Sequence, residues 1–303
     1  MNELHALTER QLILVTGKGG VGKSALTATL GRCLAARGRR TLIFEVDPRE
    51  NLHQLLDVAP SGGEIVEVTP NLYLQNLKPR DVVDWVVEKQ VKIGMVVKRV
   101  LKSPIYHRFA DGAPGLTEMA ILGHALRVVR GELKRAPKID TVILDAPATG
   151  HGIYLLTAPQ LFAETVQQGP FEELASDAAR FIANPENCGL VVVTLAEEMP
   201  VQEALELRQD LFDKFGRGPD LLVANGLYPP LPEASGPESE DDPLLRLWRQ
   251  RRGVNEREMQ RLTREWDGPR VDLPLLSIDR GADLVNALEA EVDAVWDGVE
   301  ADS

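Results

Sequence analysis

Five short runs of β-branched and aliphatic residues recur along the chain, and each ends in a small or polar residue. They span Gln11 to Thr16, Thr41 to Val46, Thr141 to Leu144, Gly189 to Leu195 and Leu221 to Ala224. Such continuous apolar runs are typical of parallel strands that are buried on both faces of a sheet. The stretches between them have helical spacing, and two of them, Ser24 to Arg37 and Pro200 to Phe215, are followed directly by glycine. The pattern predicts an α/β fold with a doubly wound, mainly parallel sheet.

The interval between the second and third runs is much longer than the others. Roughly ninety residues lie there, far more than one crossover helix requires. Asp81 to Lys102 places many valines on one broad apolar face, and Leu116 to Leu133 has the pattern of a second helix. We therefore expect residues 60–138 to form a mainly helical subdomain, inserted into a single domain that covers residues 1–303.

Two segments near the end of the chain differ from the rest in composition. We expect residues 229–243 to form an exposed loop within the domain, because their sequence, PPLPEASGPESEDDP, is acidic and rich in proline. Leu244 to Trp266 is rich in arginine and glutamate, which favours a solvated, salt-bridged helix or helix pair. A docking role for this segment is the alternative.

Composition and charge exclude several classes of protein. The chain of 303 residues is 44% hydrophobic and 26% charged, as in ordinary globular proteins, and its net charge of -12 opposes nucleic-acid binding. The first residues, MNELHALTERQ, lack the layout of a signal peptide, and no apolar run approaches the ~20 residues of a membrane span. Cys33 and Cys188 have no metal-ligand spacing, which fits a reducing compartment. We expect a cytoplasmic protein with no nucleic-acid partner and no direct membrane insertion.

A glycine-rich segment directly follows the first predicted strand. It consists of Gly17, Lys18, Gly19, Gly20, Val21, Gly22, Lys23 and Ser24, and it satisfies the phosphate-loop pattern GxxxxGK[ST]. The glycines let backbone amides point at phosphate oxygens, and the start of the next helix adds partial positive charge. We expect Lys23 to reach the β- and γ-phosphates and the Ser24 hydroxyl to ligate Mg²⁺ directly. The sequence thus predicts an ATPase that uses ATP and Mg²⁺.

Two aspartates follow predicted strands, at the edge of the sheet where ligands of such folds bind. Asp47, before Pro48, is a candidate catalytic residue, because its carboxylate can orient the attacking water or bind Mg²⁺ through water. A role as a strand-ending turn alone is the alternative. Asp145 is the candidate acid that binds Mg²⁺ through water, and the turn Thr149-Gly150-His151 is a candidate sensor of the γ-phosphate. For His151, a purely structural hydrogen bond is an equally good interpretation.

Three motifs together resemble one family of ATPases. GKGGVGKS, DPREN at Asp47 and DAPATGHG at Asp145 are similar to motifs of the arsenite-pump ATPase and of the ATPase that targets tail-anchored membrane proteins. Weaker matches are APGLTE at Ala113 and LPLL at Leu273, so the resemblance covers most of the chain. It implies the fold of a P-loop NTPase and a dimer that opens and closes with ATP hydrolysis.

The same resemblance assigns roles to three further residues. Lys18 is an extra lysine that marks a deviant Walker A loop, in which it crosses a dimer interface and stabilises charge on the partner's nucleotide. This makes Lys18 a second candidate catalytic residue, and a solvated lysine without a partner is the alternative. Asn225 matches a position whose amide recognises adenine, and Glu197 falls where the family places a glutamate of the nucleotide pocket.

Departures from the family pattern narrow the expected role. The arsenite-binding and zinc-binding cysteines of these relatives are missing, so the resemblance is to a bacterial-type member without arsenite transport or a zinc-clipped dimer. Cys33 and Cys188 are instead expected to be small core residues. The predicted helical subdomain contains Met95 and Met119 among stiff valines, which favours internal or dimer packing over a groove for a protein client.

The expected function is therefore Mg²⁺-dependent ATP hydrolysis coupled to dimer opening and closing, which drives a client or partner event in targeting or transport. The dimer is either a homodimer or a heterodimer with a paralogous ATPase, and the helical subdomain is the candidate place for a protein client. A slowly turning over, nucleotide-gated scaffold that assembles with a related ATPase is the alternative.

Overall fold

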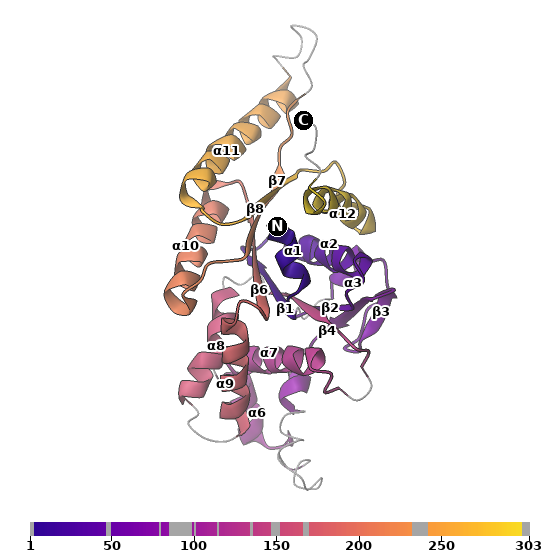
Figure 1. Ribbon diagram of the computed structural model, residues 1–303, viewed down its shortest axis with the longest axis vertical. Coiled ribbons are helices and arrows are strands. Elements are labelled where there is room, and N and C mark those ends of the chain that lie inside the picture. The colour runs from indigo at the N-terminus through magenta and orange to yellow at the C-terminus, as the bar shows by residue number, and fades with distance from the viewer. Residues whose placement is uncertain are drawn as a thin grey trace.

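The computed structural model describes residues 3–46, 50–78, 80–84, 99, 101–113, 115–133, 136–146, 152–165, 170–231 and 242–298. Among these residues, eight strands form one sheet in the order β3-β4-β2-β5-β1-β6-β7-β8 (Figure 1). The strands are β1 (Leu12–Gly17), β2 (Thr41–Glu45), β3 (Val66–Thr69), β4 (Leu72–Asn76), β5 (Thr141–Asp145), β6 (Cys188–Leu195), β7 (Leu221–Leu227) and β8 (Arg270–Pro274). Neighbouring strands pair in parallel, except for the antiparallel pair β3 and β4. The predicted α/β fold with a mainly parallel sheet is confirmed.

The described helices lie on both faces of this sheet. They are α1 (Glu3–Thr8), α2 (Lys23–Ala36), α3 (Leu52–Leu55), α6 (Pro104–Gly112), α7 (Leu116–Val129), α8 (Gly152–Thr165), α9 (Pro170–Ala183), α10 (Glu198–Phe215), α11 (Pro243–Glu265) and α12 (Ala282–Trp296). In β1, Leu12 and Leu14 belong to a core that includes α7, α8 and α9, whereas Ile13 and Val15 belong to a core that includes α2 and α12. Side chains of a strand alternate between faces, so a strand with a core on each side needs apolar residues at every position.

Both cysteines belong to these cores. Cys33 lies on α2 in the core shared with α12, and Cys188 begins β6 in the opposite core. Both thiols are buried and neither is in a disulfide, and burial raises the pKa of each well above its ordinary value. They are small core residues, as the sequence predicts.

The interval between β2 and β5 contains both strands and helices. β3 and β4 fall inside the range 60–138 but extend the main sheet, and α6 and α7 come after them. α7 packs against α8 and α9, which follow β5 in the chain, and Figure 1 shows α6 to α9 gathered at one end of the molecule. The helix expected from Asp81 to Lys102 falls largely outside the described residues.

The arginine-rich segment near the end of the chain is a single helix, α11, of 23 residues. It begins with a well-formed cap, because the Asp242 side chain accepts a hydrogen bond from the Leu244 amide at 2.8 Å and Pro243 occupies the first turn. Most of the preceding acidic loop, residues 232–241, lies outside the described residues. No helix within the described ranges has both the length and the hydrophobicity that crossing a bilayer would require.

Candidate active site

The glycine-rich segment forms the turn between β1 and α2, as its sequence predicts. Gly17, Gly20 and Gly22 have φ values of 148°, 81° and 95°, which lie in the region that favours glycine. At Gly17 a Cβ atom would stand 2.2 Å from the carbonyl oxygen of Val193, so β1 and β6 can approach here only if the side chain is absent. Gly22 caps α2, so the loop leads directly to the positive end of that helix.

Lys23 and Ser24 are the first two residues of α2. The Lys23 side chain folds back over the loop, and its Nζ atom donates a hydrogen bond to the carbonyl oxygen of Lys18 at 2.7 Å. Lys23 is buried, and burial lowers its pKa, while the Asp145 carboxylate acts in the opposite direction. The structure thus places a desolvated ammonium group within the turn that the sequence assigns to phosphate.

Asp145, the last residue of β5, is close to the same helix. Its Oδ2 atom accepts a hydrogen bond from the Ser24 hydroxyl at 2.6 Å, and its Oδ1 atom accepts one from the Thr27 hydroxyl at 3.3 Å. Asp145 is buried, and this burial raises its pKa to about 6, despite the opposing effects of Ser24 and Lys23. The structure therefore brings Ser24 and Asp145 together, although 121 positions separate them in sequence.

This pair fits a Mg²⁺ ion chemically. Mg²⁺ prefers hydroxyl and carboxylate oxygens and is usually held by one or two protein side chains together with substrate phosphates. A buried carboxylate with a raised pKa is also a group whose charged form a nearby cation would stabilise. Thr27 was not anticipated from the sequence, although its spacing of three residues from Ser24 places both hydroxyls on one face of α2.

The two residues expected in the nucleotide pocket lie in different surroundings. Asn225 stands within β7, and its Nδ2 atom donates a hydrogen bond to the carbonyl oxygen of Val21 at 2.9 Å. Asn225 therefore contacts the phosphate loop itself. Glu197 precedes α10, and its Oε1 atom lies 3.5 Å from the Nη1 atom of Arg251 on α11. The adenine role of Asn225 and the pocket role of Glu197 stay predictions.

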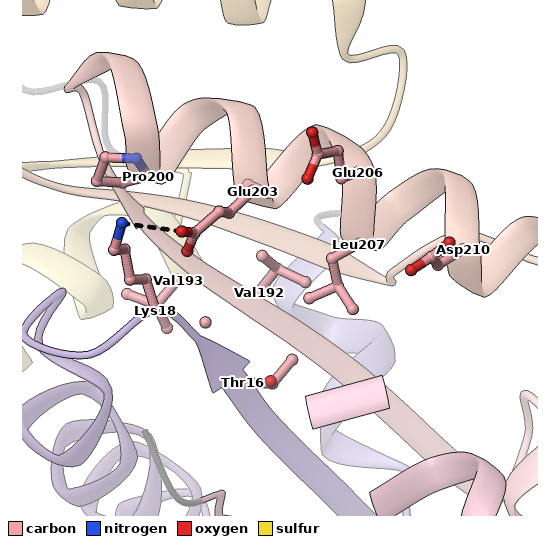
Figure 2. Close-up of a pocket in the computed structure, with 11 residues that line it drawn as sticks. Thr16, Lys18, Val192, Val193, Pro200, Glu203, Glu206, Leu207 and Asp210 are labelled. Carbon is pink, nitrogen blue, oxygen red and sulfur yellow. Dashed lines mark ion pairs between the residues drawn. The ribbon is translucent and has the colours of Figure 1, made fainter. Parts of the chain in front are cut away.

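Lys18 has a partner within its own chain. Its Nζ atom lies 2.8 Å from Oε1 of Glu203 on α10, and both side chains are more than a third exposed. Figure 2 shows the Lys18 side chain extending toward α10, beside a cavity of about 220 Å³ between β1, β6 and α10. Half-exposed ion pairs contribute only about 0 to 1 kcal/mol, so this contact leaves the lysine easy to release. The role of Lys18 on a partner's nucleotide stays a prediction, as does the alternative of a solvated lysine without a partner.

The sequence predicts two switch segments that respond to the nucleotide, Asp47-Pro48 and Asp145 with the turn Thr149-Gly150-His151, and most of their residues lie outside the described residues. These are Asp47, Pro48, Thr149, Gly150 and His151. Their neighbours in the chain are placed: β2 ends at Glu45 and β5 ends at Asp145, and these two residues are register partners on adjacent strands. The roles of the switch residues therefore stay predictions, whereas the strands that lead to them end side by side.

Comparison with known proteins agrees with this arrangement. A family model for anion-transporting ATPases matches residues 10–169, from the start of β1 to beyond α8. ATPase BagA of Mycobacterium tuberculosis is 28% identical over 214 residues, which cover 66% of this chain and 61% of that protein. An arsenical pump-driving ATPase of Acidiphilium multivorum is 27% identical over 250 residues, covering 77% of this chain and 41% of that protein.

A plant protein extends this set of relatives. ATPase GET3C of Arabidopsis thaliana is 24% identical over 182 residues, covering 55% of this chain and 46% of that protein. The chain spans about half the length of the curated relatives that it matches. The family match alone covers more than half of the 303 residues and contains the loop, both aspartates and the TGH turn. The chain therefore belongs to the family of anion-transporting ATPases.

Proposed function

We propose that the protein hydrolyses ATP with Mg²⁺ and that hydrolysis is coupled to the opening and closing of a dimer. The observation that carries this proposal is the 2.6 Å contact between Ser24 and Asp145, directly behind a phosphate loop in which Lys23 is already buried. Each relative described above is named as an ATPase, which supports the same reaction.

In this proposal, different residues bind the phosphates, hold Mg²⁺ and orient the attacking water. Amides of the loop and the positive end of α2 would bind the phosphates, and the Lys23 ammonium would neutralise the β- and γ-phosphates. Ser24, with Asp145 acting through water, would hold Mg²⁺, which when bound neutralises charge on the phosphate oxygens. The Asp47 carboxylate would orient the attacking water, because a carboxylate accepts hydrogen bonds from it.

The proposal of a dimer rests on the expected role of Lys18. In the proposed closed dimer, this lysine leaves Glu203 and stabilises charge on the nucleotide of the partner, either a second copy or a paralogous ATPase. Opening after hydrolysis would drive a client or transport-associated event, as the name of the arsenical pump-driving relative suggests. The segment after Asp145 leads directly into α8, so we place the client or partner response in the helices α6 to α9. Residues 60–138 stay proposed as an insertion within a single domain.

Asp47→Asn tests the hydrolytic role of the first aspartate. The variant is expected to bind ATP within about threefold of wild type and to lose at least about 100-fold in turnover, because the phosphate cradle is intact but the carboxylate that orients water is gone. Calorimetric titration with ATP and steady-state phosphate release, each with and without Mg²⁺, measure the two quantities. Wild-type turnover in the variant would contradict the assignment, and tight ATP binding without turnover in the wild type would favour the scaffold.

Lys18→Ala tests the proposed dimer. Turnover is expected to fall at least about tenfold, whereas ATP binding by the isolated subunit changes less than about threefold, since the lysine would act on the partner's nucleotide. Lys138→Ala, which removes an exposed lysine far from the loop in sequence, serves as the matched control. Sedimentation with ATP and Mg²⁺ should show a dimer, and an unaffected turnover rate in Lys18→Ala would remove this argument.

A further inference from the structure

A buried carboxylate lies where β2 ends, two residues before Asp47. Glu45 is only 2% exposed. Its Oε1 atom accepts hydrogen bonds from the backbone amide of Asn51 at 2.6 Å and from that of Leu52 at 3.1 Å. Leu52 is fully buried and begins α3. One carboxylate oxygen thus holds the chain at the start of α3, four and five residues after Asp47 in the sequence.

The same carboxylate is fixed from its other side. Its Oε2 atom accepts a hydrogen bond from Asn76 Nδ2 at 3.4 Å, and Asn76 is the last residue of the neighbouring strand β4. The main chain adds a further link, because the Leu77 amide donates to the carbonyl oxygen of Glu45 at 2.7 Å. Glu45 therefore has a defined place between two strand ends, and its side chain cannot turn away without breaking these contacts.

A second carboxylate extends this network. The Glu50 side chain accepts hydrogen bonds from the amides of Ser61 at 2.7 Å and Gly62 at 3.1 Å. The Ser61 hydroxyl in turn accepts a hydrogen bond from the Asn76 amide at 2.8 Å. Residues 50–52 are thereby connected, through two carboxylates, to the ends of β2 and β4.

We infer that Glu45 is a positioning residue for Asp47, because its carboxylate fixes the chain on both sides of residues 47–49. The chain leaves β2 at Glu45, beside its register partner Asp145, and returns at Asn51, which Glu45 itself holds. The described residues that precede and follow Asp47 in the sequence are therefore linked through the Glu45 side chain, and Glu45 itself is paired with Asp145 at the end of β5. This inference rests on the proposed function, in which Asp47 orients the attacking water.

The chemistry of the side chain explains why a glutamate suits this task. An ionised carboxylate has two oxygens that accept several hydrogen bonds and donate none. It can therefore accept hydrogen bonds from two adjacent backbone amides and from the Asn76 side-chain amide at the same time. Glutamine retains an acceptor oxygen of the same reach, whereas alanine would leave the buried amides without this acceptor. Comparing these two variants separates the geometric role from a role of negative charge.

The test compares Glu45→Ala, Glu45→Gln and Asp220→Ala in the full chain. Asp220 is the matched control, because its carboxylate also accepts a backbone amide, from Leu190 at 2.8 Å, but lies directly before β7, at the opposite end of the strands from the loop. Glu45→Ala is expected to lower kcat at least tenfold with KM for ATP changed less than threefold, and Glu45→Gln to keep kcat within threefold of wild type. Asp220→Ala should lower the melting temperature without lowering kcat.

Hydrogen exchange gives a second readout that does not depend on turnover. Mass spectrometry of peptides that contain residues 50–55 should show at least tenfold faster amide exchange in Glu45→Ala than in wild type, and near wild-type exchange in Glu45→Gln. Unchanged exchange, or a kcat in Glu45→Gln as low as in Glu45→Ala, would overturn the positioning role. Absence of turnover in the wild-type protein would instead overturn the proposed ATPase, and the exchange rates would still decide whether Glu45 holds residues 51 and 52.

Discussion

Lys23→Ala is expected to reduce ATP turnover to background and to weaken ATP binding at least about 100-fold. Removing one preorganised group that stabilises transition-state charge typically costs about 10² to 10³ in rate, and Lys23 is also expected to contact the ground-state phosphates. The ammonium is already desolvated and lies across the loop at 2.7 Å from the Lys18 carbonyl oxygen, so it needs little rearrangement to reach a ligand there. Phosphate release and calorimetric titration with ATP measure the two effects.

A matched control for this variant is Lys214→Ala, which removes an exposed lysine from the last turn of α10. It should bind and hydrolyse ATP as the wild type does. Circular dichroism of Lys23→Ala should show the wild-type helix and strand content, because α2 keeps its apolar contacts with the core. If Lys23→Ala hydrolysed ATP at the wild-type rate, the nucleotide site would have to lie elsewhere.

Gly17→Ala is expected to cost at least about 3 kcal/mol of unfolding free energy. The added Cβ would stand 2.2 Å from the carbonyl oxygen of Val193, the residue on β6 that pairs with Gly17, and backbone of a central strand cannot move aside easily. Gly20→Ala is the matched control: its φ is also positive, at 81°, but no atom lies within 4 Å of the added carbon. That variant should lose only about 1 to 2 kcal/mol, from backbone strain alone.

Urea unfolding followed by circular dichroism measures both losses. The comparison isolates the clash between strands from the conformational preference of glycine, since the two variants share only the latter. Equal losses in Gly17→Ala and Gly20→Ala would show that the close approach of β1 and β6 contributes nothing to the requirement for glycine at the start of the loop.

The central strands were predictable because they are buried on both faces. β2 and β5 are buried at every position, and the apolar runs at Thr41 and Thr141 reflect this directly. The strands at the sheet edges are not predicted by such runs, since β3 alternates between partly buried and exposed positions over only four residues and β8 is buried at only two of its five. α8 was also missed, and it carries a proline inside the helix, at Pro159, which sequence rules treat as a breaker.

The candidate site was predictable only as far as local motifs extend. The phosphate-loop pattern assigns roles to Lys23 and Ser24 at once, because the chemistry of the loop depends on residues adjacent in the chain. Glu203 and Glu45 belong to no such motif. Glu203 resembles any acidic residue on an exposed helix, and Glu45 is a single charged residue within the apolar run from Thr41 to Val46. Their importance comes from contacts across the fold, with Lys18 and with the amides of residues 51 and 52.

The strand order has a thermodynamic consequence for any ligand that binds at the loop. β5 lies between β2 and β1, so the ends of three strands from distant parts of the chain meet at one place. A nucleotide bound there would act as a reversible cross-link among these segments, and unfolding any of them would release it. Its binding free energy then adds to the stability of the middle of the sheet, by RT ln(1 + [L]/Kd), while the edge strands β3 and β8 gain only indirectly.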